Sequence, residues 1–194
     1  MASQGERRAR TRQALLDAAA ALFAERGVEG ASVDAVAEAA DRTSGAVYDH
    51  FGSKDGLLFA LLEGWVDDVA AVTGAELSTA TSLEERMAVM WRNVADPVVG
   101  DGRWIALEHE LWSYATRNEQ ARQYLARRYR VVWDSVNEGV AEWVDGADDV
   151  GPALIGLLLG LEMMRRVDPD ALTDDMAVAA LCGVVTGSDR RATT

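Results

Sequence analysis

Apolar residues recur at intervals of three and four along most of this chain, which is the spacing of one face of an α-helix. The first such segment runs from Arg12 to Arg26, and Gly27 follows it as a helix stop. Two short helices are predicted next, over residues 32–40 and 43–49. No alternation of period two stands out that would indicate strands. The pattern therefore predicts an all-α fold.

A fourth helix is predicted to start at Lys54, directly after Ser53 as its N-cap. One side of it is apolar over a long distance, through Leu58, Leu61, Leu62, Trp65, Val69 and Val72. Because this helix extends well past the first three, we place a domain boundary near Leu57. We expect a first domain over residues 1–56 and a second over residues 57–194.

The second domain continues with the same helical spacing. Apolar positions mark three helices around residues 87–94, 104–115 and 125–143. Two last helices are predicted at about 152–167 and 173–185. Both are apolar around much of their circumference, so we expect a second face of each to be buried.

The net charge of the 194-residue chain is −13, and it is unevenly placed. Residues 1–60 hold 7 basic and 9 acidic side chains, net −2, whereas residues 61–194 hold 12 and 23, net −11. The amino-terminal part can therefore present a local positive face. The longest apolar stretch, Ala153–Leu161, is far shorter than the ~20 residues of a membrane span, and no apolar export segment begins the chain. We expect a cytoplasmic protein that does not insert into membranes.

The sequence offers little for catalysis. It has two histidines and one cysteine, Cys182, which is expected to be a buried small side chain. No nucleotide-binding glycine loop and no histidine–carboxylate spacing of a metal site is present. We therefore predict no enzyme activity, no metal site and no cofactor.

Two short helices joined by a tight turn and braced by a preceding helix form a helix-turn-helix, whose second short helix enters the DNA major groove. In this chain Asp41 and Arg42 form the turn, and Thr43 can cap the second short helix. Lys54 stands in the first turn of the next helix, where unpaired N–H groups and a lysine charge together suit a phosphate. The segment therefore predicts binding to double-stranded DNA.

Residues 11–62 resemble the amino-terminal domain of the TetR family of transcriptional repressors, in the sequence TRQALLDAAAALFAERGVEGASVDAVAEAADRTSGAVYDHFGSKDGLLFALL. The shared features include the Thr-Arg start, the His-Phe pair, and Ser-Lys followed by Leu-Leu. The resemblance implies that DNA is contacted at base edges by Thr43 and Ser44, at the sugar-phosphate chain by Gly45, and at phosphates by Tyr48, His50 and Lys54. Alternatively, Tyr48 packs on the first helix and His50 caps the short helix.

The turn departs from the family pattern of glycine, an apolar residue, serine and lysine. This chain has Asp41, Arg42, Thr43 and Ser44 there. Aspartate tolerates the left-handed backbone that a turn requires. Arg42 can supply the positive charge that Ser44 lacks, so we include it among the DNA-binding residues. Asp49 is unexpected beside phosphates, because its negative charge should weaken DNA binding. It would fit if its carboxylate accepts from a cytosine amino group or holds a neighbouring arginine in place.

Four arginines precede the first predicted helix or begin it: Arg7, Arg8, Arg10 and Arg12. They form either a solvated tail or a basic arm that reaches phosphates or the minor groove.

All six tryptophans lie beyond residue 60. Aromatic and methionine side chains there can line a cavity for a small apolar or aromatic effector. The candidate ligand-binding residues are Met87, Trp91, Trp104, Glu108, Trp112, Trp133 and Met163. Alternatively, these side chains form an ordinary core. Glu108 would then be half of a buried ion pair with Arg127 or Arg128.

The TetR resemblance also implies that the last two helices pair with their copies in a homodimer. Taken together, the sequence predicts a ligand-responsive repressor that binds a palindromic operator as a homodimer and is released by its effector. The alternative is a dimeric helical interaction module in which DNA binding is weakened or lost.

Overall fold

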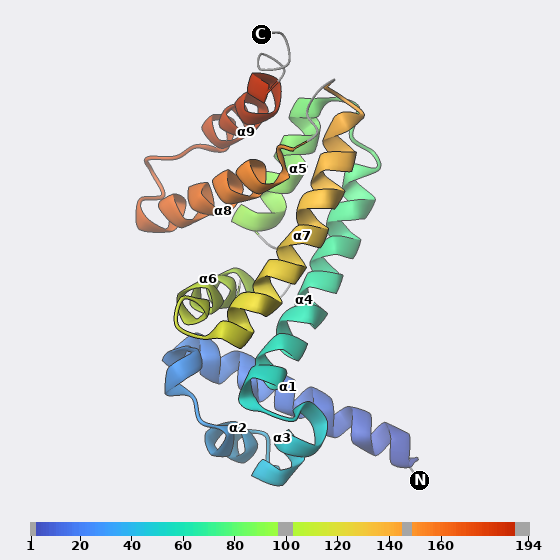
Figure 1. The fold of residues 1–194 in the computed structure, drawn as a ribbon, viewed down its shortest axis with the longest axis vertical. Helices are drawn as coiled ribbons and strands as arrows, with labels where there is room; N and C mark the ends of the chain where they lie inside the picture. The colour runs from blue at the N-terminus through green and yellow to red at the C-terminus, as the bar shows by residue number, and fades with distance from the viewer. Residues whose placement is uncertain (1–2, 97–102, 145–148, 189–194) are drawn as a thin grey trace. The chain divides into compact units, whose positions relative to one another are not determined.

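The computed structural model describes residues 3–96, 103–144 and 149–188, and Figure 1 shows their arrangement. Throughout these ranges the regular structure is α-helical, which confirms the predicted all-α fold. The helices are α1 (Gln4–Gly30), α2 (Val33–Ala39), α3 (Ser44–Phe51), α4 (Lys54–Leu77), α5 (Leu83–Ala95), α6 (Arg103–Ala115), α7 (Glu119–Ala141), α8 (Gly151–Val167) and α9 (Asp174–Ser188).

The chain forms two compact units, and each contains segments distant in sequence. The first unit comprises Met1–Asp68 and Val99–Leu125, and the second comprises Val69–Val98 and Ala126–Thr194. Helix α6 belongs to the first unit because it packs against α1. The division into two functional domains after residue 56 stays a prediction.

Helix α1 starts eight residues earlier than the apolar pattern indicates, at Gln4 instead of Arg12. The cause is a capping box: Ser3 Oγ accepts from the backbone N–H of Glu6, and the Glu6 carboxylate accepts from the N–H of Ser3. Gly27 adopts φ 71° and ψ 166°, so the regular helix breaks where the sequence predicts its stop.

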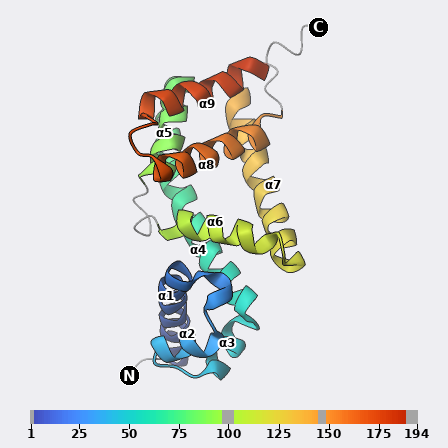
Figure 2. The same ribbon diagram turned by 90° about the vertical axis from the view of Figure 1, so that its left-hand side faces the viewer.

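The helix-turn-helix is fixed by local hydrogen bonds. Ser32 Oγ accepts from the N–H of Ala35 and Thr43 Oγ1 from that of Ala46, which confirms both predicted N-caps. Asp41 has φ 53°, the left-handed conformation expected of it. Figure 2 shows α2 and α3 next to each other below α1. Their inward side chains are buried and include Val36, Ala37 and Val47, which join Leu15, Ala19, Phe23, Leu57 and Leu58 in one core.

In the second unit, α5 packs against both α8 and α9, and these two pack against each other (Figure 2). A polar cluster connects the three helices. The indole N–H of Trp91 on α5 donates to Asp174 Oδ1 of α9 over 2.8 Å, and Arg165 of α8 forms an ion pair with the same carboxylate. The Arg165 guanidinium also lies 5.6 Å from the centre of the Trp91 ring. None of the described helices is long and apolar enough to cross a membrane.

Candidate functional site

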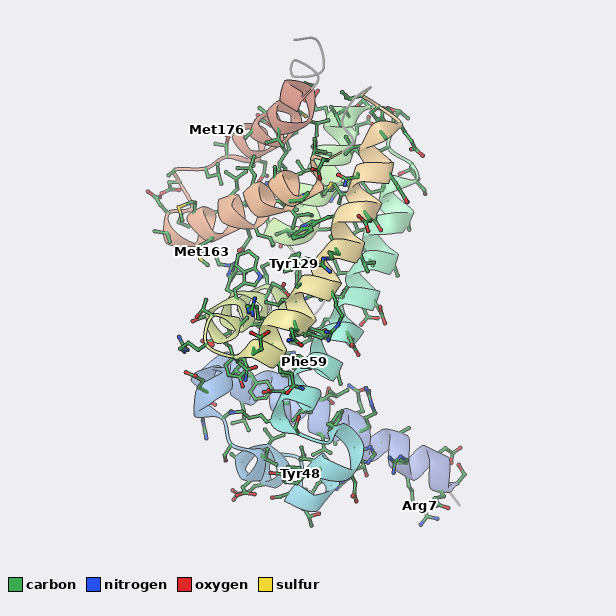
Figure 3. All side chains as sticks on the ribbon, in the orientation of Figure 1. Arg7, Tyr48, Phe59, Tyr129, Met163 and Met176 are labelled. Atoms are coloured by element: carbon green, nitrogen blue, oxygen red, sulfur yellow. The ribbon has the colours of Figure 1, made fainter. Side chains whose placement is uncertain are left out.

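Helix α3 turns one face to the core and the other to solvent. Val47 is fully buried and anchors the helix, whereas Gly45, Tyr48 and Asp49 are exposed. Tyr48 on α3 (Figure 3) is 54% exposed, so more than half of it is open to solvent. The exposed face therefore offers a short, rigidly capped helix with small residues at its amino end, which suits entry into a major groove.

Ser44 is the first residue of α3 and is half-buried. Its hydroxyl donates to Oδ1 of Asp34, which lies in the first turn of α2. The two side chains thus join the two helices of the motif at the end that would face DNA. The sequence does not reveal this pair, because the residues are ten positions apart and belong to different helices.

Arg42 is exposed and partly engaged by the residue before it. Its Nη1 donates to the backbone carbonyl of Asp41 over 2.6 Å and lies 3.9 Å from Asp41 Oδ2. The backbone N–H of Arg42 donates to the carbonyl of Ala37 over 2.8 Å and so closes the turn. A contact of its guanidinium with DNA stays a prediction.

The arginine-rich segment is helical, not an extended arm, because α1 includes Arg7, Arg8, Arg10 and Arg12. This part of α1 lies beside the carboxyl end of α3. Arg8 Nη2 donates to the backbone carbonyl of Asp49 over 3.4 Å, and the Arg12 guanidinium lies 5.4 Å from the centre of the Phe51 ring. Positive charge therefore reaches the end of α3 from another helix.

His50 lies at the same place, and its pKa is lowered. Partial burial is the main cause, and the positive charges of Arg8 and, to a smaller extent, Arg12 also lower the pKa. The negative charge of Asp49 raises it, but not enough to cancel these effects. With a pKa below the ordinary 6.5, the imidazole is neutral at pH 7. A neutral imidazole can still donate one hydrogen bond to a phosphate but brings no charge.

Lys54 is directed into the protein. Its Nζ lies 2.8 Å from the carbonyl oxygen of Val28, 3.1 Å from that of Ala31 and 3.5 Å from that of Glu29. The end of α1 at Gly30 leaves the last carbonyls of the helix without helical partners, and the ammonium group supplies donors there. The predicted phosphate contact is untested, but it would compete with these three bonds.

The carboxyl end of α6 is joined to two elements of the helix-turn-helix. Tyr114 Oη donates to Asp55 Oδ1 in the first turn of α4 over 2.8 Å, and Asn118 Nδ2 donates to Tyr114 Oη over 2.7 Å. Arg117 Nη2 pairs with Glu29 Oε2 at the end of α1 over 2.9 Å. We call Tyr114, Arg117 and Asn118 with these two carboxylates the α6 clasp. Burial of Tyr114, with the Asp55 carboxylate beside it, raises the pKa of its hydroxyl.

The predicted ligand-binding residues are divided between the two units. Trp104, Glu108 and Trp112 lie on α6 in the first unit, and Glu108 is only 1% exposed. The other four lie in the second unit: Met87 and Trp91 are buried, whereas Trp133 and Met163 are half-buried. Trp133 stacks on Tyr129 at 5.8 Å, and the Trp91 indole N–H is already bound to Asp174. Their role in ligand binding stays a prediction.

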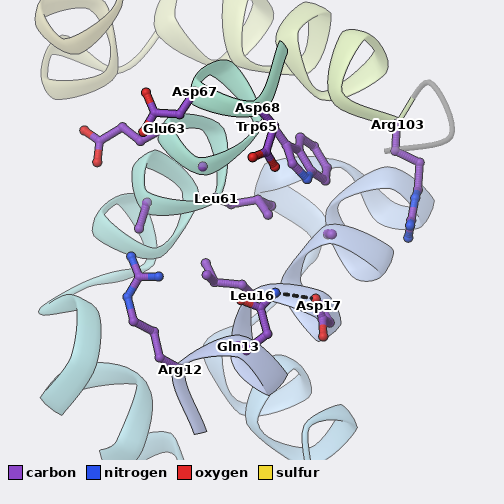
Figure 4. A pocket seen from close by; sticks show the side chains of 13 residues that line it. Arg12, Gln13, Leu16, Asp17, Leu61, Glu63, Trp65, Asp67, Asp68 and Arg103 are labelled. Atoms are coloured by element: carbon purple, nitrogen blue, oxygen red, sulfur yellow. Dashed lines mark hydrogen bonds between the residues drawn. The ribbon is translucent and has the colours of Figure 1, made fainter. Parts of the chain in front are cut away.

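A hollow of about 500 Å³ opens in the first unit between α1 and α4, next to Arg103 (Figure 4). None of the predicted ligand-binding residues lines it. Its wall is mainly polar and carries the carboxylates of Asp17, Glu63, Asp67 and Asp68, together with the ring of Trp65. It is therefore unlike the apolar cavity that the sequence predicts.

Comparison with known proteins agrees with this geometry. Residues 15–61 match the family model described as bacterial regulatory proteins, tetR family. The chain is 47% identical over 58 residues to the HTH-type transcriptional repressor KstR2 of Rhodococcus jostii, covering 30% of this chain and 28% of that protein. It is 32% identical over 127 residues to the HTH-type transcriptional repressor AcnR of Corynebacterium diphtheriae, covering 66% and 62%. In both alignments the chain spans less than two thirds of the relative.

The fold is shared over a greater length. A crystal structure of a TetR-family transcriptional regulator from Rhodococcus sp. superposes with a TM-score of 0.72 and 23% sequence identity, covering 91% of this chain and 97% of that one. Most of the chain thus shares the fold of this regulator, whereas the match to the family model is confined to residues 15–61. Over residues 15–61 the chain therefore carries the amino-terminal domain of the TetR family of bacterial regulatory proteins.

Proposed function

We propose that the protein is a transcriptional repressor that binds double-stranded DNA through α3. The observation that carries this proposal is the exposed face of α3, held by two capped helices within the segment that matches the family model. Two similar proteins, KstR2 and AcnR, are transcriptional repressors by name. The residues proposed to face DNA are Arg42, Thr43, Ser44, Gly45, Tyr48 and His50.

The test is binding of the purified full chain to DNA from the region upstream of its own gene, measured by fluorescence anisotropy at low salt. Tyr48→Ala should weaken binding without unfolding the protein, because Tyr48 is largely exposed. Val131→Ala on α7 is the matched control, since it truncates another largely exposed side chain far along the sequence from α3. If no fragment is bound, the protein is instead a helical interaction module.

We further propose a homodimer formed through α8 and α9. Met164 and Val167 on α8 and Met176 on α9 are each more than half exposed, although large apolar side chains normally avoid water. A twofold contact would bury them, and two copies of α3 could then bind successive half-sites of a palindrome. Sedimentation velocity of the Met164→Asp and Met176→Asp variants should show monomers. A dimer that both variants retain would place the interface elsewhere.

A small apolar or aromatic effector is proposed to contact α6. The buried Trp104 and Glu108 lie on this helix, and the α6 clasp at its other end holds α1 and α4. An effector that favours one position of α6 would thereby favour one arrangement of the helix-turn-helix. Tryptophan fluorescence of the wild type and of Trp104→Phe, titrated with hydrophobic compounds, tests this. A response that persists unchanged in the variant would count against contact at Trp104.

A further inference from the structure

The pair formed by Asp34 and Ser44 has a consequence for which bases the protein can read. A serine hydroxyl has one proton to donate and lone pairs that accept. In this structure the Ser44 proton is directed to Oδ1 of Asp34, an ionised carboxylate that accepts strongly. What Ser44 can offer to anything else is therefore an acceptor.

Acceptors select among base edges in the major groove. Adenine presents an amino donor at N6 and cytosine at N4, whereas the groove edges of guanine and thymine present acceptors. A serine whose hydroxyl can rotate freely satisfies either kind of edge. A serine whose proton is held by a carboxylate satisfies only an amino group.

We propose that Asp34 is a specificity-determining residue, which holds the proton of Ser44 so that Ser44 selects adenine or cytosine on one strand of each half-site. The inference rests on the proposed function, because it requires α3 to lie in the major groove. Ser44 is the first residue of α3, the end from which such helices contact base edges.

The position of Asp34 fits this role. It lies in the first turn of α2, where the helix dipole favours a negative charge, and it is exposed. A carboxylate near DNA is repelled by phosphates, so removing it should raise affinity for every sequence. The proposed effect is separate from that general one, since it changes the ratio between bases at one position.

The experiment measures relative affinities for all four bases at each position of a half-site, by selection from a randomised library followed by competition titration. The proteins are the full chain, Asp34→Ala, Ser44→Ala and the double variant. Glu38→Ala is the matched control, because it removes another exposed carboxylate from α2. Thermal unfolding of each variant confirms that it is folded.

The wild type should prefer adenine or cytosine at one position, and Asp34→Ala and Ser44→Ala should each reduce that preference on the order of fivefold, the value of one hydrogen bond. The double variant should lose no more than either single variant, because both changes remove the same contact. Glu38→Ala should raise general affinity and leave the preference intact.

Three results would overturn the inference. One is an unchanged preference in Asp34→Ala. Another is a Ser44-dependent preference for guanine or thymine in the wild type. The third is a preference that Asp34→Ala abolishes but Ser44→Ala retains, which would mean that the Asp34 carboxylate contacts the base itself. If the wild type binds no DNA selectively, the proposed function fails and this inference fails with it, a result distinct from selective binding that Asp34→Ala leaves unaltered.

Discussion

Lys54 is the only lysine in the chain. Replacing it separates two roles, a contact with a DNA phosphate and a bond between α4 and α1 inside the protein. The Lys54 ammonium group donates to the carbonyls of Val28, Glu29 and Ala31, and it thereby ties the first turn of α4 to the end of α1. A net contribution of ~1.5–3 kcal/mol is typical of hydrogen bonds to a charged group, and partial exposure to solvent reduces it. We expect Lys54→Met to cost about 2 kcal/mol of folding free energy, because it removes the donors and keeps most of the aliphatic chain.

Thermal unfolding measures this cost. For a chain of this size, about 2 kcal/mol corresponds to a fall of about 4–8 °C in Tm. Arg10→Met is the control, since Arg10 is exposed on α1, and its Tm should stay near that of the wild type.

DNA binding supplies the second measurement. Removal of a direct phosphate contact lowers the slope of log K against log salt by about 0.9. A brace inside the protein has no such effect, so Lys54→Met should bind all sequences more weakly with an unchanged slope. If the variant has wild-type stability and a slope reduced by about 0.9, the reasoning is refuted and Lys54 contacts a phosphate instead.

Three further outcomes are expected. DNA binding should strengthen as the pH falls below about 6.5, because the lowered pKa leaves His50 neutral at pH 7 and its protonation adds a charge beside phosphates. The trend should be absent in His50→Gln. The pKa of Asp174 is lowered, first by the hydrogen bond from Trp91, so its contribution to stability is present above the ordinary pKa of 3.8 and is lost as the pH falls below it. In acid titrations followed by circular dichroism, Trp91→Phe should therefore lose less stability than the wild type between about pH 5 and about pH 3. Gly27→Ala should lower Tm by a few degrees, the equivalent of about 1 kcal/mol, because φ is 71° and the added carbon would lie 3.1 Å from Glu110 Oε1; an unchanged Tm would contradict this.

Features that depend on neighbouring residues could be predicted from the sequence. The caps at Ser32 and Thr43 and the left-handed Asp41 follow from chemistry within three residues, and the structure has all of them. The early start of α1 also depends on local residues, Ser3 and Glu6, but these precede the apolar pattern, so helical spacing does not indicate it.

Contacts between distant residues could not be predicted in this way. The acceptors of Lys54 lie 23 to 26 residues before it, at the end of α1, where the last carbonyls of the helix have no helical partners. The α6 clasp joins positions that are 59 to 88 residues apart. Helical spacing identifies which face of a helix is buried, but it does not identify the helix that covers that face.

Two acidic residues of the helix-turn-helix have structural roles that account for their presence in a segment proposed to bind a polyanion. Asp41 forms the turn, and Asp34 holds Ser44. Helix α3 itself contains no lysine or arginine, and its histidine is neutral at pH 7. We therefore expect the positive charge that attracts phosphates to come from other elements, namely Arg42 in the turn and the arginines of α1, two of which contact the end of α3. In the proposed complex, Ser44 on α3 would select bases, whereas the arginines of α1 and Arg42 would supply most of the general attraction to phosphates.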